Sequence, residues 1–572
     1  MSSDQLAVAR APQAGREGRG GGVSALLGTV ILGLVGVLLV EVLFEAWVQH
    51  LQGSFTYGPD DRRVITLPDW PKNLKNGLYL TLLALTVVKV AVDRSWRRFL
   101  TAADIAIAVL GVLMVVAGVL GGSRATLVGE ALFVYFRGVI VFYAWRAVSP
   151  QWRRVRPLLW VLGVVLVLNS LMALVQMVVG PPAYEEIGWL EMTWSAIYRA
   201  HGFVDHPNHL GHLLGVAMLG LLAWSVARPG LPRKWWWLFG LFAVALSATQ
   251  SREATLGFLA GAVLIGLLRR GRWRPVVATI VVVSLLTAGQ LALRPKNRAE
   301  LQRRLAGVFS AFEVPSGEEG EDYCVEGTVT DTEDCTNRIP QREIRALYAQ
   351  QGIRILGGSP LLGFGVGQFG GIVAEKDDPN WNMDPRFGPG GFDMHGSTQK
   401  QVDSFWLHLM VEVGLLGLMA YLVWLFLLVL PILRRLPMRN LLVGRGPPAA
   451  PGAQVHPVAY WAPATLFFAV LVAFLSPALE DPLFPPLLFT VLGLAWVLLN
   501  RGELVSPGPA PDPDQTGSGR ADLGQVGAPE TQRPLPDEPA RPAGDAVRLA
   551  GRPPGGSDLG SDLTSAHRAR GE

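Results

Sequence analysis

The sequence predicts an all-α polytopic membrane protein with about twelve transmembrane helices and a large extracytoplasmic loop before the last three. Half of its 572 residues are hydrophobic and only 17% are charged. Apolar stretches long enough to cross a bilayer recur along most of the chain. Basic residues gather in every second loop between these stretches. The formal net charge of +4 is therefore mostly a signal of topology and gives no reason to expect nucleic-acid binding.

Each apolar stretch should form a helix, because a bilayer offers no water to unpaired backbone groups. The predicted helices cover residues 23–47, 76–92, 102–122, 128–145, 157–180, 208–227, 235–249, 253–268, 275–293, 415–433, 460–479 and 482–500.

The basic loops place both termini in the cytoplasm under the positive-inside rule. These loops carry Arg94, Arg97 and Arg98; Arg153, Arg154 and Arg156; Arg228, Arg233 and Lys234; Arg269, Arg270, Arg272 and Arg274; and Arg434, Arg435 and Arg439. The remaining loops are short or acidic, as at Glu480 and Asp481, and should face outward. The first apolar run is too long for a cleavable signal peptide and has no small-residue cleavage site.

Five segments follow from this topology. Residues 1–22 should be a disordered cytoplasmic N-terminus, and residues 23–293 should hold transmembrane helices 1–9. Residues 294–404 should form the extracytoplasmic loop domain. Residues 405–500 should hold an interfacial helix and transmembrane helices 10–12. The tail 501–572 is rich in Pro and Gly and should be a disordered cytoplasmic extension.

The outer loop contains the chain's only two cysteines, Cys324 and Cys335. An outward loop lies in an oxidising compartment, so we expect a disulfide between them, with two free thiols as the alternative. Residues 341–357 form an amphipathic pattern typical of a helix. The Gly-rich run 360–369 lacks the Lys-Ser/Thr of a nucleotide-binding loop, which favours a structural turn.

Two outward arginines, Arg199 and Arg252, are not needed as topology anchors, and each lies beside a helix start. Guanidinium groups suit diphosphates because they stay charged and offer forked donors. A helix N-terminus also favours an anion. The pair therefore indicates a shared anionic ligand. The alternative is an ordinary interfacial arginine that binds lipid headgroups or a nearby Glu.

Three histidines, His206, His209 and His212, recur at helical spacing beside Asp205 and could bind zinc. The Pro-Asn pair after His206 instead suits a helix start. We therefore expect no metal here.

Three blocks resemble the O-antigen ligase and O-antigen/exopolysaccharide polymerase superfamily. They are Arg199-Ala-His-Gly-Phe-Val-Asp-His-Pro-Asn-His-Leu-Gly211; Ser247-Ala-Thr-Gln-Ser-Arg-Glu-Ala-Thr-Leu-Gly257; and Pro360-Leu-Leu-Gly-Phe-Gly, followed by Asp403-Ser-Phe-Trp-Leu-His-Leu-Met-Val-Glu-Val-Gly-Leu-Leu-Gly417. With the long outer loop they cover residues 200–430 approximately.

The resemblance implies a metal-independent glycosyltransferase, without a cofactor, in the bacterial inner membrane. Its active site would face the periplasm. The donor would be a glycan on undecaprenyl diphosphate, and the acceptor a saccharide or a lipid-A core, in lipopolysaccharide or exopolysaccharide biosynthesis. Arg199 and Arg252 would hold the diphosphate. Asn208 and His201 would contact the donor or support Arg199.

The second part of the third block starts with Asp403, where family ligases have a histidine, so the chain resembles polymerase-like members at this position. Asp403 is the first choice for the base that deprotonates the acceptor, and an N-cap is its alternative role. His395 is the other possible base. His408, within an apolar helix, is predicted to be a packed core residue.

A transporter or lipid flippase would also need many helices and cations for a lipid diphosphate. Such a protein should carry its cations along a central cavity, in paired halves. A membrane scaffold for an envelope complex is a third possibility, in which the arginines would be dispensable. The two arginines lie instead at one face, beside a large outer domain, which favours a fixed reaction site.

Overall fold

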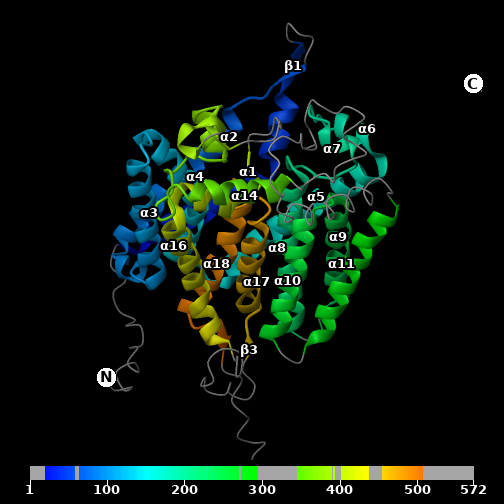
Figure 1. The fold of residues 1–572 in the computed structure, drawn as a ribbon. Coiled ribbons are helices and arrows are strands. Elements are labelled where there is room, and N and C mark those ends of the chain that lie inside the picture. The colour runs from blue at the N-terminus through cyan, green and yellow to red at the C-terminus, as the bar shows by residue number, and fades with distance from the viewer. Residues whose placement is uncertain are drawn as a thin grey trace, which may run out of the picture. The chain divides into compact units, whose positions relative to one another are not determined.

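The computed structural model describes residues 20–57, 63–228, 230, 232–269, 272–293, 344–388, 391–392, 401–436 and 454–506. These residues form a helical bundle with short helices and a hairpin at one end (Figure 1). The long helices are α1 (Gly20–Gln52), α2 (Trp70–Val92), α3 (Ala102–Leu120), α4 (Ala125–Val148), α5 (Trp152–Val179), α8 (Pro207–Ala227), α9 (Arg233–Thr249), α10 (Arg252–Leu268), α11 (Trp273–Leu293), α16 (Phe405–Arg435), α17 (Val458–Val472) and α18 (Phe484–Asn500).

Each predicted apolar stretch coincides with one of these helices. Among the described residues, eight helices are long and apolar enough to cross a membrane, and α17 and α18 are shorter apolar helices. The chain is therefore an all-α polytopic membrane protein, as the sequence predicts. The number of crossings and the side on which each loop lies stay predictions.

Helix α8 lies in the interior of the bundle. In its apolar window 78% of the residues are buried, against 17% in that of α11. A helix that is hydrophobic all round is expected to be buried on all sides. It packs against α9, α10 and α17, so the residues that begin α8 are held by several neighbours at once.

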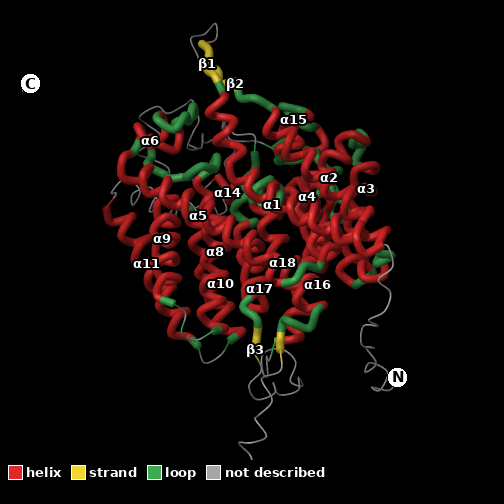
Figure 2. The backbone as a smooth tube through the Cα atoms, turned by 180° about the vertical axis from the view of Figure 1, so that it is seen from behind, coloured by secondary structure: helices red, strands yellow, loops and turns green. Residues whose placement is uncertain are grey.

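The shorter elements lie mostly at one end of the bundle, where Figure 2 shows the hairpin and α15. They are β1 (Ser54–Tyr57), β2 (Arg63–Thr66), α6 (Pro181–Glu185), α7 (Thr193–Ala196), α14 (Ile344–Leu356) and α15 (Ile372–Asp377), with the 3-10 turns Trp381–Met383 and Pro385–Phe387. The 3-10 turn Trp96–Phe99 joins α2 to α3. The short antiparallel pair β3 (Gln454–Val455) and β4 (Val505–Ser506) involves the segments before α17 and after α18.

Helix α16 begins at Phe405 and is broken at Gly414, just before the predicted span 415–433. Gly414 has a φ of 67°, and a Cβ there would overlap the carbonyl of Leu361. The Gly-rich run follows the break closely, because the Phe364 amide donates to the Val411 carbonyl at 2.9 Å. This run is a structural turn that attaches the segment 344–369 to α16.

The predicted helix 341–357 is observed as α14. Its Tyr348 and Ile355 are buried in a second apolar cluster with Phe369, Trp381, Phe387 and Phe392. Ile353 of the same helix, although apolar, is 60% exposed.

Three predicted functional residues, Cys324, Cys335 and His395, lie outside the described residues. The disulfide and the alternative base therefore stay predictions.

Candidate functional site

Arg199 lies in the turn between α7 and α8, and its guanidinium is held on two sides. Its Nε donates to the Thr249 carbonyl at 3.0 Å, and its Nη2 donates to Asn208 Oδ1 at 2.7 Å. The guanidinium also stacks over the Trp194 ring, 5.2 Å from its centroid. A planar fork held by two acceptors and an aromatic face has little freedom to rotate.

The first two blocks, one around Arg199 and one around Arg252, are joined by two hydrogen bonds. The Ala200 amide donates to the Ala248 carbonyl at 3.1 Å. Gln250 Nε2 donates to the Tyr198 carbonyl at 2.9 Å. Two segments about fifty residues apart in the chain therefore lie side by side.

A residue in the left-handed region of backbone conformation lies one position before Arg199 and two positions before Arg252. Tyr198 has a φ of 55° and Gln250 a φ of 54°. Non-glycine residues in this region carry a conformational cost and cluster at functional sites. Arg252 is the first residue of α10 and is exposed, while Ser251 caps the helix by accepting from the Ala254 amide.

Asn208 and His201 support Arg199 from different sides. The Asn208 side-chain oxygen accepts from the guanidinium, and the backbone amide of Asn208 donates to His206 Nδ1 at 3.0 Å. His201 is 1% exposed, and its Nδ1 donates to the Val204 carbonyl. Its ring packs near Tyr184, whose hydroxyl donates to the Arg199 carbonyl at 2.7 Å.

Burial lowers the pKa of His201 to about 4, although the bond to Val204 and the charge of Asp205 act in the opposite direction. The ring is therefore neutral near pH 7. The ring supports the turn that carries Arg199 through its contact with Tyr184.

The three histidines that could have formed a metal site have separate partners. His206 caps α8, and His212 Nε2 lies 3.0 Å from Glu253 Oε1. His209 lies between two carboxylates, with Nδ1 2.6 Å from Asp205 Oδ1 and Nε2 2.7 Å from Asp481 Oδ2. Within the described ranges, no three His, Cys, Asp or Glu side chains converge as metal ligands would.

Asp403 lies before α16 and is 43% exposed at its side chain. Arg345 of α14 places Nη2 3.0 Å from Asp403 Oδ2. The N-cap of α16 is Ser404, whose side chain accepts from the Leu407 amide. Asp403 is thus not the cap, and its carboxylate faces the surface beside a guanidinium.

The loop between α17 and α18, residues 473–483, carries polar groups that the sequence left without a role. Glu480 Oε1 lies 2.7 Å from His408 Nδ1, and the Glu480 carbonyl accepts from Arg137. His408 is buried, as predicted, but is paired with a carboxylate. An adjacent acidic pair in an otherwise apolar short loop, Glu480 and Asp481, is the signal that could have indicated this role.

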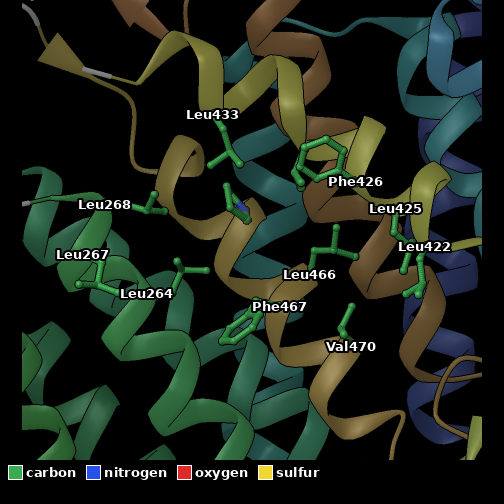
Figure 3. Close-up of a pocket in the computed structure, with 12 residues that line it drawn as sticks. Leu264, Leu267, Leu268, Leu422, Leu425, Phe426, Leu433, Leu466, Phe467 and Val470 are labelled. Carbon is green, nitrogen blue, oxygen red and sulfur yellow. The ribbon is translucent and has the colours of Figure 1, made fainter. Parts of the chain in front are cut away.

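An apolar cavity of about 340 Å³ lies between α10, α16 and α17 (Figure 3). Its lining is entirely apolar and includes Leu264 and Leu268 from α10, Phe426 from α16 and Phe467 from α17. From Arg252 to Leu264, α10 rises about 18 Å, at 1.5 Å per residue. The cavity can therefore hold a hydrocarbon chain at membrane depth below the arginine site.

Fold and geometry together define a multi-pass membrane protein in which one arginine begins α10 and another lies in the adjoining turn before α8. Residues 237–422 match the model of a protein family described as O-antigen ligase. The chain is thus a membrane protein with an O-antigen ligase domain, which confirms the resemblance drawn from the three blocks. This family implies a glycan-transfer enzyme with lipid-linked glycan substrates. A search of curated proteins finds no match.

Arg252 and Asp403 fall inside the matched range, whereas Arg199, His201 and Asn208 precede it.

Proposed function

We propose that the protein transfers a glycan from undecaprenyl diphosphate to a sugar hydroxyl at the outer leaflet, in the synthesis of a surface polysaccharide. The observation that carries this proposal is the hydrogen-bonded junction of the Arg199 and Arg252 segments, in a chain with an O-antigen ligase domain.

In this proposal Arg199 and Arg252 bind the donor diphosphate. As the anomeric carbon–oxygen bond breaks, the electron pair moves to the departing phosphate oxygen, and the guanidiniums stabilise that charge. The starts of α8 and α10 add partial positive charge. Asn208 fixes the orientation of Arg199, and His201 supports its backbone.

The prenyl chain of the donor is assigned to the membrane-facing side of the same helices. The apolar cavity beside α10 supports this assignment, because its lining offers no polar partner and suits a hydrocarbon.

The acceptor hydroxyl must lose a proton as its oxygen attacks the anomeric carbon. We assign the removal of this proton to Asp403, with His395 as the alternative base. The half-exposed carboxylate of Asp403, beside Arg345, is accessible to an acceptor. A positioned base contributes about 10²–10⁴-fold in rate.

The site is assigned to the periplasmic side of a bacterial inner membrane, because the basic loops mark the opposite side as cytoplasmic. Neither a metal nor a cofactor takes part in the proposed chemistry. The departing charge is neutralised by guanidiniums.

A transporter or flippase for a lipid-linked oligosaccharide is the second possible function. It would use the same lipid diphosphate chemistry. Arg252 begins α10 and Arg199 lies in the turn before α8 at the same end of the bundle, and this placement favours a fixed reaction site over alternating access.

The test is transfer by the purified protein in liposomes, with an undecaprenyl-diphosphate oligosaccharide and a saccharide acceptor. We expect a longer glycan on the acceptor and loss of product in Arg199→Ala and Arg252→Ala. Arg228→Ala is the matched control, because Arg228 also stacks over a tryptophan, Trp224, but at the other end of α8.

Donor that crosses the liposome membrane without product would overturn the transferase and favour the flippase. Wild-type activity in both arginine variants would overturn the assignment of the site and favour the scaffold.

A further inference from the structure

Asp205, His209 and Asp481 form a clasp at the start of α8. The two ring nitrogens of His209 lie 2.6 and 2.7 Å from carboxylate oxygens of Asp205 and Asp481. The side chains are graded in exposure, with Asp205 52%, His209 22% and Asp481 5% exposed. The clasp therefore runs from the surface into the protein.

Nδ1 of His209 donates a hydrogen bond to Asp205, because a carboxylate offers only acceptors. Nε2 lies 2.7 Å from Asp481 Oδ2, at ion-pair distance. With an imidazolium between the two carboxylates, the clasp carries one net negative charge. The Leu483 amide donates to Asp481 Oδ1 at 2.9 Å, which holds the buried carboxylate in place.

The carboxylates keep their charge for the same reason. Burial by itself would raise the pKa of Asp481, but the charge and hydrogen bond of His209 bring it down to about 2. The pKa of Asp205 also lies below its usual value, since the charge of His209 outweighs burial. The other titratable and charged groups facing the clasp are the rings of His206 and His212, the guanidinium of Arg137 and the phenol of Tyr79.

The clasp connects the two halves of the site. His209 follows Asn208, which holds the Arg199 guanidinium. Asp481 follows Glu480, which pairs with His408 of α16. Phe405 comes two residues after Asp403, and its amide donates to the Ala473 carbonyl of the loop 473–483 at 3.0 Å. One ionic contact thus links the start of α8 to the loop that holds the start of α16.

We propose that Asp205, His209 and Asp481 are positioning residues for the transfer reaction. Resting on the function proposed above, the clasp fixes Asn208 and the Arg199 guanidinium relative to the segment that carries Asp403. Donor and base are then aligned only while His209 bridges the two carboxylates.

The experiment measures kcat and KM for donor transfer, as a function of pH, in His209→Gln and His209→Lys. Without a cation the carboxylates repel each other, so we expect kcat/KM to fall about tenfold or more in His209→Gln, since small displacements at a reacting centre are costly. His209→Lys keeps a cation and should recover part of the rate. We expect the wild type to lose rate when alkaline pH deprotonates His209. His209→Lys should lack this loss of rate.

His456→Gln is the control, because His456 is likewise a partly buried histidine, but it packs against Trp152 and Trp224 and lies before α17. It should keep the wild-type rate and pH profile. If His209→Gln fails to fold, Asp205→Asn replaces it, because the half-exposed Asp205 can lose its charge with little effect on packing.

The inference is overturned if His209→Gln, or Asp205→Asn in its place, keeps the kcat/KM and pH profile of the wild type while Arg199→Ala is inactive. In that outcome the proposed function still stands. If the wild-type protein transfers no glycan under any condition, the proposed function is wrong, and the positioning role that depends on it is wrong as well.

Discussion

Replacing Arg199 by lysine keeps the positive charge of the donor site but removes its fixed geometry. The guanidinium donates to Thr249 at 3.0 Å and to Asn208 at 2.7 Å, and it stacks on Trp194. A lysine ammonium can keep one of these hydrogen bonds. The lost bond from a charged donor is worth about 1.5–3 kcal/mol, and the lost stacking about 0.5–1 kcal/mol.

The sum of about 2–4 kcal/mol corresponds to a loss of about 30- to 1000-fold in kcat/KM, at 1.4 kcal/mol per factor of ten. The assay is chromatographic measurement of the extended acceptor at several donor concentrations. Arg228→Lys, at the far end of α8, should change the rate less than threefold, as expected for a site remote from the reaction. An Arg199→Lys enzyme within about threefold of the wild type would refute the view that the fixed guanidinium fork, and not charge alone, binds the donor.

Three further predictions concern single side chains. Gly414→Ala should destabilise the protein by about 2 kcal/mol or more, because of its φ of 67° and the adjacent Leu361 carbonyl, whereas Gly289→Ala, with open space around it, should be neutral in a detergent melt. The protein should lose up to about 3 kcal/mol of stability as the pH falls from 6.5 to 4, since the unfolded state binds a proton at His201 before the folded state does. That loss should be absent in His201→Phe, and equal pH dependence in both proteins would contradict the argument. Asp403→Asn should lower kcat about 10²–10⁴-fold with donor affinity unchanged, and an unchanged kcat would leave His395 as the base.

The positions of the helices could be predicted because bilayer thickness fixes the length of an apolar run. Ends that depend on tertiary contacts could not. Helix α17 ends at Val472, before the predicted limit of 479, because residues 473–483 turn back to hold the start of α16. Helix α16 starts at Phe405, where the interfacial helix was predicted to start, but it continues into the predicted span across the break at Gly414, because its first part packs against the second apolar cluster.

The two arginines could be singled out in the sequence because arginine is scarce on the face of a membrane protein that the positive-inside rule predicts to be outward. The clasp was not visible. Asp481 lies 272 positions after His209 (481 − 209), and no local pattern connects residues that far apart. The spacing of the three histidines is also compatible with a metal site, which the Pro-Asn helix start argued against, and it does not reveal that the three rings point to different carboxylates or to a helix cap.

The matched domain holds only part of the proposed site. Arg252 and Asp403 lie within residues 237–422, but Arg199, Asn208 and His209 come before this range, and Asp481 comes after it. The parts meet because α8 is buried in the bundle and its first two turns contact both α10, through His212 and Glu253, and the loop after α17, through His209 and Asp481. The chemistry proposed for this family domain therefore needs the flanking helices. A change that shifts the start of α8 should impair transfer even when every residue of the matched domain is intact.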